Sequence, residues 1–340
     1  MKPPTTDGAA GAAAIRDFQE TAAAVRAEIA KVVVGHTTAI ERILTAFFAG
    51  GHVLIEGVPG IGKTLLVRSL ADALALRMSR IQFTVDLMPA DVTGTRVVEE
   101  TASGRRDLVF VPGPVFAHVV LADEINRATP KTQAALLEAM AEQQVTVAGT
   151  TRELPEPFFV LATLNPIEME GTYRLPEAQL DRFFFKVVLD YPSESELVEI
   201  FARTTAAALP AVTPVLDREN APARIARLRQ LVRDVLVAPA VERWVASLVR
   251  LTVPATTTSD TVRRHVTFGA SPRGGQALLL GAKVTALLEG RPHVTPADVE
   301  RVAHAALGHR LVLGFGADAA GVDATRVVDE VLAAARSGRP

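Results

Sequence analysis

The segment 57–64 constrains the fold of this chain more than any other. It reads Gly-Val-Pro-Gly-Ile-Gly-Lys-Thr and fits the pattern G-x-x-x-x-G-K-[ST]. It follows the apolar run His52–Glu56, which is typical of a buried strand, and it precedes leucines at helical spacing. Glycines let backbone N–H groups curl around a phosphate, and the N-terminus of the next helix favours the same anion. The sequence therefore predicts a phosphate-binding loop between a strand and a helix.

Two side chains of this loop have specific chemistry. Lys63 supplies a positive charge for the β- and γ-phosphates of a nucleotide, and the Thr64 hydroxyl is suited to coordinate Mg²⁺. The alternative is a glycine turn that happens to precede a lysine, with odds on the order of one in a hundred at ordinary glycine content. The residues expected to contact the nucleotide here are Gly57, Pro59, Gly60, Ile61, Gly62, Lys63, Thr64 and Leu65.

A second apolar run, Val119–Leu121, leads into two carboxylates, Asp123 and Glu124. Ligands of a parallel sheet lie beyond the carboxyl ends of its strands. We therefore expect Asp123 to hold Mg²⁺ and Glu124 to act as general base on the attacking water. The alternative is an acidic strand end that only faces solvent. The presence of the second acid favours hydrolysis over a bare nucleotide-binding switch.

A third buried run, Phe158–Thr163, is followed by Asn165. An amide beyond a strand end can bridge the attacking water and the γ-phosphate. The alternative is that Asn165 and the proline after it only mark a turn. None of the three asparagines precedes a lysine, so the Asn-Lys-x-Asp motif that reads guanine is absent. Adenine is therefore the expected base.

The order of the apolar runs predicts an α/β P-loop core with a parallel five-stranded sheet covered by helices on both faces. The five runs are His52–Glu56, Ile81–Val85, Val119–Leu121, Phe158–Ala162 and Phe184–Leu189. Two further segments, 96–111 and 145–154, pair short extended stretches around glycine-containing turns and indicate β-hairpin inserts. After Tyr191 the spacing is helical, apart from a polar loop over 254–268.

These patterns divide the chain of 340 residues into three parts. Residues 1–14 contain little to bury and are expected to form a flexible tail. Residues 15–191 form the α/β core, and residues 192–340 form an all-α lid domain. Trp244 is expected in the lid core, whereas His304 and His309 are expected to be ordinary residues of the lid surface.

The composition excludes several classes of protein. Lys plus Arg (36) nearly balance Asp plus Glu (38), so there is no basic excess of the kind that clamps nucleic acid. The absence of cysteine excludes disulfides, thiolate metal sites and cysteine nucleophiles. No uncharged apolar stretch reaches a membrane-spanning length, and segment 1–14 lacks the apolar run of a secretion signal. We expect a cytoplasmic protein without a membrane span.

Several longer strings resemble the AAA+ ATPases of the MoxR family. The resemblance covers about residues 33–313 and is carried by Val33-Val34-Gly35 and by the segments 110–116, 123–128, 131–140, 175–183 and 271–273. The most specific of these read Asp-Glu-Ile-Asn-Arg-Ala from 123 and Leu-Pro-Glu-Ala-Gln-Leu-Asp-Arg-Phe from 175. The resemblance implies ATP and Mg²⁺ as the nucleotide and the metal.

The family implies a role for each matching residue. Asp123 and Glu124 correspond to the Walker B pair and Asn165 to sensor 1. Val34 and Gly35 correspond to the box beside the adenine. Arg182 matches the arginine finger that reaches the nucleotide of a neighbouring subunit, and Arg273 matches sensor 2 in the lid. A surface ion pair with Asp181 or Glu177 is the alternative for Arg182. Arg127 either contacts the interface nucleotide or caps a turn.

An arginine finger that acts between subunits requires head-to-tail assembly, and the family implies a hexameric ring. It also implies a chaperone-like or remodelling role, with ATP between core and lid, and partners that carry von Willebrand factor A domains. The client is not identified. His36 and Leu164 depart from the family pattern, which leaves their adenine or water contacts open. The alternatives are a nucleic-acid motor of the MCM-like type and an ATP-gated assembly switch with little turnover.

Overall fold

The computed structural model of the chain describes residues 6–100, 106–165, 172–207 and 210–338. Its centre is a five-stranded sheet in the order β2-β5-β8-β1-β9. All four neighbouring pairs are parallel, which confirms the predicted sheet. The strands are β1 (Val53–Glu56), β2 (Met78–Gln82), β5 (Val119–Asp123), β8 (Phe159–Leu164) and β9 (Phe185–Val188).

The strand β2 begins three residues before the predicted run Ile81–Val85. Among the described strands it pairs only with β5, from Met78↔Val119 to Gln82↔Asp123, and so stands at one edge of the sheet. Only Ile81 of its five residues is buried. Because an edge strand is held mainly by its ladder hydrogen bonds, its apolar pattern locates it poorly.

The sheet separates two hydrophobic cores. Alternate residues of the central strands point to opposite faces, so that Val119 of β5 joins one core and Val120 the other. The helices α1 (Thr6–Val32), α2 (Thr37–Ala49) and α3 (Lys63–Ala73) share the first core. The helices α4 (Pro89–Thr93) and α5 (Pro130–Glu142) belong to the second. The core is therefore covered on both faces, as the sequence predicted.

The N-terminal helix differs from its expected extent. A flexible tail was expected over 1–14, but α1 begins at Thr6. The segment 9–14 is mostly alanine, which has the highest helix propensity of all residues, so it continues the amphipathic helix backwards along the chain. Within the expected tail, residues 1–5 lie outside the described residues.

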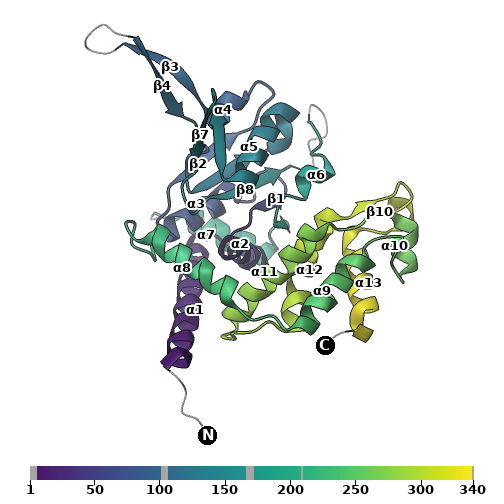
Figure 1. Cartoon of the computed structure of the whole chain (residues 1–340). Coiled ribbons are helices and arrows are strands. Elements are labelled where there is room, and N and C mark those ends of the chain that lie inside the picture. Colours follow the sequence, from purple (N-terminus) through teal and green to yellow (C-terminus); the bar gives the residue numbers. More distant parts are fainter. Residues whose placement is uncertain (1–5, 101–105, 166–171, 208–209, 339–340) are drawn as a thin grey trace.

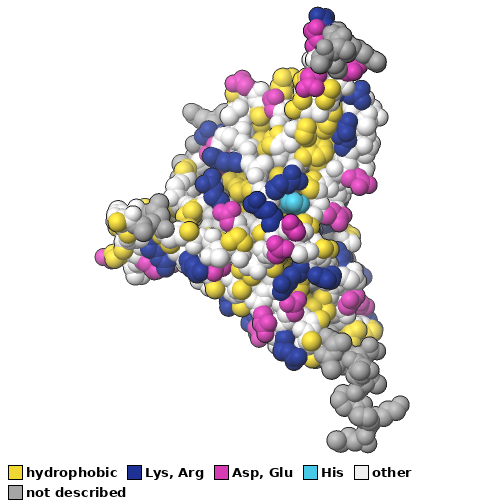
Figure 2. All heavy atoms as spheres, turned by 90° about the vertical axis from the view of Figure 1, so that its left-hand side faces the viewer, with side chains coloured by type: hydrophobic (Ala, Val, Ile, Leu, Met, Phe, Trp, Pro, Cys, Tyr) yellow, Lys and Arg dark blue, Asp and Glu magenta, His cyan; other side chains and the backbone are white. Residues whose placement is uncertain are grey.

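Both predicted hairpins are present. β3 (Gly94–Glu100) pairs with β4 (Arg106–Pro112) antiparallel, and β6 (Gln144–Val147) pairs with β7 (Thr150–Glu153). The β3–β4 hairpin projects from the core (Figure 1). Hydrophobic side chains gather on the face of the molecule below its tip (Figure 2). The hairpin's exposed apolar residues are Val97, Val98, Leu108, Val109 and Val111. The expected turn at 103–104 lies outside the described residues.

The chain after Tyr191 is mainly helical. Its helices are α7 (Glu194–Thr204), α8 (Ala221–Asp234), α9 (Pro239–Leu251), α10 (Asp260–His265), α11 (Pro272–Leu288), α12 (Pro296–Leu307) and α13 (Ala324–Ala334). A short antiparallel pair, β10 (Val266–Phe268) with β11 (Val312–Leu313), adds two strands to a lid that was expected to be all α. α10 lies within the expected polar loop. Trp244 is buried and donates from Nε1 to the carbonyl of Ala335 at 2.9 Å.

The first two helices after the sheet pack on the core. Arg203 of α7 donates to the carbonyls of Ala30 and Lys31 at the end of α1. Arg229 of α8 donates to the carbonyl of Phe47 in α2 at 3.0 Å. We call α9 to α13 the lid bundle; its helix α11 contacts α1 and α2, and α12 contacts β9. Among the described residues, no helix combines the length and apolarity needed to cross a membrane.

Candidate nucleotide-binding site

The phosphate-binding loop joins β1 to α3. Gly60 and Gly62 have φ of 83° and 87°, a left-handed conformation that side chains disfavour. Lys63 is the first residue of α3, is buried, and donates from Nζ to the carbonyl of Gly57 at 2.6 Å. Thr64 follows it on the first turn of α3. The loop thus presents backbone N–H groups, a helix N-terminus and a lysine at the carboxyl end of the sheet.

The carboxylate of Asp123 lies at the end of β5, beside β8. Its Oδ1 accepts a hydrogen bond from the Thr163 hydroxyl at 2.7 Å, and the same hydroxyl accepts from the backbone N–H of Glu124 at 2.8 Å. Its Oδ2 accepts from Nη2 of Arg80 at 2.6 Å and from Nε at 3.1 Å. An exposed arginine therefore neutralises this carboxylate, at the position where a metal ion is expected.

The carboxylate of Glu124 is also held by neighbouring side chains. Its Oε2 accepts from Gln82 Nε2 at 2.8 Å and pairs with Arg127 Nε at 3.1 Å. Glu124 itself has φ of 56°, an uncommon backbone conformation outside glycine that clusters at functional sites. Within the chain Arg127 thus contacts Glu124, and its role toward an interface nucleotide stays a prediction. Gln82 and Arg80 were missed by the sequence analysis; the signal would have been two polar residues in β2 at positions paired with β5.

Asn165 directly follows β8 and is buried. Because β8 lies between β5 and β1 in the sheet, Asn165 lies between the two carboxylates and the phosphate-binding loop. It therefore stands at the same edge of the sheet as Lys63 and Glu124. The order of the strands brings together residues that are separated by up to a hundred positions along the chain.

A cavity of about 470 Å³ adjoins the phosphate-binding loop. Its walls are Val32, Val33, Val34, His36, Pro59, Gly60, Ile61, Gly62, Leu65, Tyr191, Pro192, Leu197, Ile200, Phe201, Arg203 and Thr204. Val34, predicted to contact adenine, lines it, while Gly35 adjoins Glu196 so closely that a Cβ would collide with the carboxylate. The α7 wall was missed, although Leu197, Ile200 and Phe201 recur at helical spacing.

The position of this cavity bears on the expected place of the nucleotide. We expected the nucleotide between the core and residues 192–340, and among the described helices of that segment it is α7 that lines the cavity. The described residues of the lid bundle pack instead against α1, α2 and β9. The lid bundle therefore lies beside the core rather than over the phosphate-binding loop.

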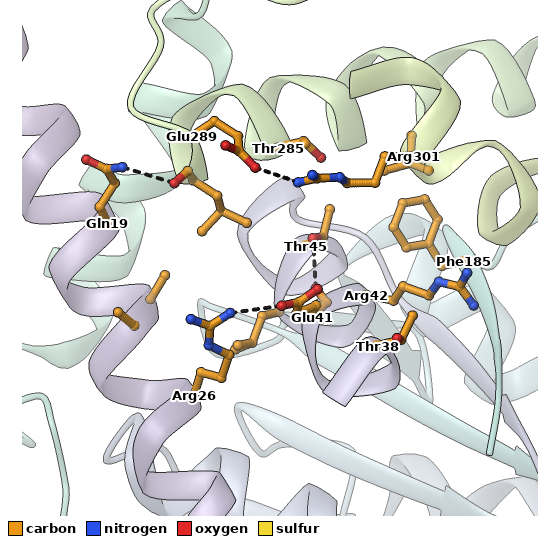
Figure 3. Close-up of a pocket in the computed structure, with 15 residues that line it drawn as sticks. Gln19, Arg26, Thr38, Glu41, Arg42, Thr45, Phe185, Thr285, Glu289 and Arg301 are labelled. Carbon is orange, nitrogen blue, oxygen red and sulfur yellow. Dashed lines mark hydrogen bonds and ion pairs between the residues drawn. The ribbon is translucent and has the colours of Figure 1, made fainter. Parts of the chain in front are cut away.

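A second cavity, of about 570 Å³, lies at the junction between α1, α2 and the lid bundle (Figure 3). Arg26 pairs with Glu41 across it, and Arg301 pairs with Glu289 on its opposite side. None of its lining residues belongs to the phosphate-binding loop or to the strand ends that bear carboxylates. It is distinct from the candidate nucleotide site.

The two predicted arginines, Arg182 and Arg273, lie at the amino ends of the strands, opposite the phosphate-binding loop. Arg182 comes just before β9, and the N–H of Phe184 bonds to the carbonyl of His52, the residue before β1. Arg182 is exposed and donates from Nη1 to the carbonyl of Leu137 at 2.6 Å. Arg273 of α11 lies 3.7 Å from Asp181. Both arginines thus stand near the amino ends of the strands, away from Lys63.

The surface ion pair considered for Arg182 does not form. Asp181 pairs with Arg310 at 2.9 Å and with Arg273, and Glu177 faces Arg174 at 3.8 Å. The carboxylates nearest in sequence to Arg182 are therefore engaged by other arginines, and its own guanidinium donates to the backbone carbonyl of Leu137.

One histidine was placed wrongly by the sequence analysis. His304 pairs with Asp329 at 2.9 Å, near the lid surface. His309, however, is turned toward the core and bonds through Nε2 to the carbonyl of Phe183 at 3.0 Å. Burial, reinforced by the charge of Arg310, lowers the pKa of His309 to about 3. Its isolated position among apolar helical residues gave no sign of this contact with the core.

The donors at the carboxyl edge fit a magnesium nucleotide. The Thr64 hydroxyl and the Asp123 carboxylate are hard oxygen ligands, and Mg²⁺ is usually held by one or two such groups together with substrate phosphates. No group of three or more metal-binding side chains occurs in the part of the chain that is described. The space beside Gly60 and Gly62 is open, because a Cβ added to either residue would meet no atom within 4 Å. These residues suit a metal that arrives with the nucleotide.

A phosphate-binding loop, paired carboxylates at a neighbouring strand end and a helical lid define the class of this protein, an AAA+ ATPase. The family model described as "ATPase family associated with various cellular activities (AAA)" matches residues 52–185, and the AAA lid domain model matches 259–331. A crystal structure of a candidate ATPase from Cytophaga hutchinsonii superposes with a TM-score of 0.86 at 37% identity, covering 94% of this chain and 96% of that one.

The relatives define the family more narrowly. Chaperone MoxR1 of Mycobacterium tuberculosis is 42% identical over 90% of this chain and 79% of its own length. Protein MoxR of Methylorubrum extorquens is 35% identical over 89% of this chain and 91% of its own. YeaC, an uncharacterised Bacillus subtilis protein, is 41% identical over 91% and 92% of the two chains. The chain belongs to the MoxR family of AAA+ ATPases.

Proposed function

We propose that this protein hydrolyses Mg·ATP at interfaces between copies of itself in a ring, and that it uses the cycle to remodel protein clients. The observation that carries the proposal is the separation of the catalytic groups within one chain. Lys63, Asp123 and Glu124 lie at the carboxyl edge of the sheet, whereas Arg182 and Arg273 lie at its amino edge.

The separation is too large for the arginines to act on the nucleotide of their own chain. β1 alone spans four residues, or about 13 Å at the rise of a parallel strand. A guanidinium must come within hydrogen-bond distance of the γ-phosphate to stabilise it. Arg182 and Arg273 would therefore serve a neighbouring copy. Such a head-to-tail contact uses two different surfaces and generates a ring when the rotation closes; the family resemblance suggests six subunits.

The residues at the carboxyl edge would divide the chemistry between them. Backbone N–H groups of the loop and Lys63 bind the β- and γ-phosphates. Thr64 and Asp123 would hold Mg²⁺, which neutralises phosphate charge. Glu124 accepts the proton of the attacking water, and Asn165 orients that water.

Two arrangements described above must change before this chemistry begins. The carboxylate of Glu124 must leave Gln82 and Arg127 in order to accept a proton from water. Asp123 must likewise exchange Arg80 for the metal. The cations of both pairs are partly exposed, with 38% of the Arg127 side chain and 50% of the Arg80 side chain accessible to solvent. Such pairs are weak and exchange readily.

The exposed surface favours protein clients over nucleic acid. The β3–β4 hairpin bears exposed valine and leucine side chains, with Val98 and Leu108 about two-thirds exposed. On the face shown in Figure 2, basic and acidic side chains are interspersed among the described residues. Apolar surface of this kind suits contact with protein. A relative of this chain is named a chaperone. The von Willebrand factor A partner implied by the family remains a prediction.

The test is ATP hydrolysis by mixed subunits. Lys63→Ala removes the phosphate-binding charge and Arg182→Ala removes the finger, so each variant alone is expected to be inactive. In an equal mixture, about a quarter of randomly formed interfaces combine an intact loop with an intact finger, and activity returns in proportion. Specific activity of the wild type should also rise with protein concentration. Full activity of Arg182→Ala, or of a monomer, would overturn the proposal.

A further inference from the structure

Arg310 links the lid bundle to the segment that bears the arginine finger. It ends a short helical turn, η2 (Gly308–Arg310), directly after α12. Its side chain is only 2% exposed. η2 contacts both β9 and α6 (Glu177–Leu180), the short helix before Arg182. In Figure 1, α6 lies beside the upper end of the lid bundle.

The Arg310 guanidinium is fully engaged with a few consecutive residues of the core. It donates to the Asp181 carboxylate at 2.9 Å and to the Asp181 carbonyl at 3.2 Å. It also donates to the carbonyls of Phe183 at 2.7 Å and Phe184 at 3.1 Å, and to that of Ala306 in its own helix. Arg182 lies between these anchored residues, and the arginine fork fixes the backbone on both sides of it.

Asp181 extends the link to the second functional arginine. Its two carboxylate oxygens accept from the Ser271 hydroxyl at 2.8 and 2.9 Å. Ser271 caps the N-terminus of α11 and accepts from the backbone N–H of Arg273 at 3.1 Å. One carboxylate thus joins Arg310, the start of α11 and the segment preceding Arg182. His309 adds a bond to the Phe183 carbonyl from the same turn as Arg310.

We infer that Arg310 is a positioning residue, which holds Arg182 and Arg273 in one rigid unit and makes the presentation of the finger depend on the position of the lid bundle. This role rests on the proposed function, because it matters only if Arg182 acts on a neighbouring copy. A shift of α12 relative to β9 would move the carbonyls that Arg310 holds and displace the Arg182 guanidinium. Misplacement of a catalytic group by about 1 Å can lower a rate by about 10²-fold.

The variant Arg310→Met keeps the aliphatic stem and removes the fork. We expect kcat to fall by about 10²-fold. The affinity of the variant's own loop for a fluorescent ATP analogue should stay within about twofold of wild type, because Arg310 is remote from that loop. Arg310→Lys keeps the charge beside Asp181 but loses most carbonyl contacts, so its kcat should lie between that of the wild type and that of Arg310→Met.

A matched control is available within the lid. Arg291 and Asp298 form a bidentate pair at 2.8 and 2.6 Å, and both residues belong to the lid bundle region. Arg291→Met therefore removes a comparable ion pair without touching the core. It is expected to lower thermal stability and to leave kcat at the wild-type value. This separates loss of lid stability from loss of finger position.

Subunit mixing distinguishes positioning from general damage. Arg310→Met mixed with Lys63→Ala should recover activity, because the first supplies intact loops and the second intact fingers. Arg310→Met mixed with Arg182→Ala should recover none. Wild-type kcat in both Arg310 variants, or failure of Arg310→Met to complement Lys63→Ala, would overturn the inference. If either of these results occurs while Arg182→Ala is inactive, only the inference about Arg310 fails and the proposed function stands. Full activity of Arg182→Ala would overturn both the inference and the proposed function.

Discussion

The two edges of the central sheet hold their charged groups in different ways. At the carboxyl edge, the carboxylates of Asp123 and Glu124 pair with arginines that are half or more than a third exposed. At the amino edge, Asp181 pairs with Arg310, whose side chain is 2% exposed. Exposed pairs contribute little and can be exchanged, whereas breaking a buried pair leaves an uncompensated charge. The pairs at the carboxyl ends of the strands can thus exchange partners, whereas the buried pair at the amino ends keeps a fixed geometry.

The largest effect is expected from a substitution that removes the general base at the carboxyl ends of the strands without disturbing the structure there. Glu124→Gln keeps the size and an acceptor of Glu124 but cannot accept the proton of water, so kcat should fall by about 10²- to 10⁴-fold. ATP binding should persist. Glu142→Gln, at the exposed end of α5, is the control. Steady-state phosphate release and equilibrium nucleotide binding measure the two effects, and an active Glu124→Gln enzyme would refute the role of Glu124.

The next effect tests the amino edge through its response to acid. His52, the residue before β1, is buried. Its Nδ1 accepts from the Val160 N–H, and its Nε2 lies 3.2 Å from the Met140 carbonyl oxygen. Burial lowers its pKa to about 4. In the unfolded chain His52 therefore binds a proton near pH 6.5, whereas in the folded protein it does so only near pH 4. This contribution to stability is complete above pH 6.5 and is lost as the pH falls.

When the pH is lowered from 7 to 5, the free energy of unfolding of the wild type should accordingly fall by ~2 kcal/mol more than that of His52→Gln. Urea unfolding at the two pH values measures the difference. His293→Gln, at an exposed site in the lid, should follow the wild-type pH dependence. Equal pH dependence of His52→Gln and wild type would show that the folded protein protonates His52 as readily as the unfolded chain does.

A smaller effect concerns the cavity wall that α7 supplies at the carboxyl edge. Ile200→Ala removes apolar contact from this wall and should weaken ATP binding roughly tenfold, in line with the loss of one to a few methylene groups from a pocket. kcat should change little. Val198→Ala is the control, because Val198 is 62% exposed on the same helix and does not line the cavity. Unchanged affinity in Ile200→Ala would place the adenine elsewhere.

The smallest effect tests whether the exposed pairs at the carboxyl edge are truly exchangeable. Arg80 forms an ion pair with Asp123, the expected metal ligand. Arg80→Gln should therefore lower the Mg²⁺ concentration needed for half-maximal ATPase activity by about two- to fivefold, which corresponds to the free energy of an exposed ion pair. Arg68→Gln, an exposed arginine of α3, is the control. A higher Mg²⁺ requirement in Arg80→Gln would mean that Arg80 supports the metal site instead of competing for it.

The two edges also differ in how far they could be predicted. At the carboxyl edge, a glycine loop or a pair of acids sits directly after an apolar run, so the motif and its structural setting are contiguous in the chain. The strand order then brings Asn165 to the same place. The place of the lid bundle could not be predicted in this way, because its packing on α1 and α2 depends on surfaces with no local motif.

The sequence by itself determined the class of the fold, the phosphate-binding loop and the carboxylates beside it, because short-range spacing specifies a strand, a turn and a helix start. Only the tertiary structure decided which groups hold those residues. Gln82 reaches Glu124 across 42 positions, and Arg310 reaches Asp181 across 129. Such partners meet through strand register and helix packing, and their side chains look like ordinary polar residues in the sequence. An arginine that fixes the finger is recognisable only once the lid bundle stands beside β9.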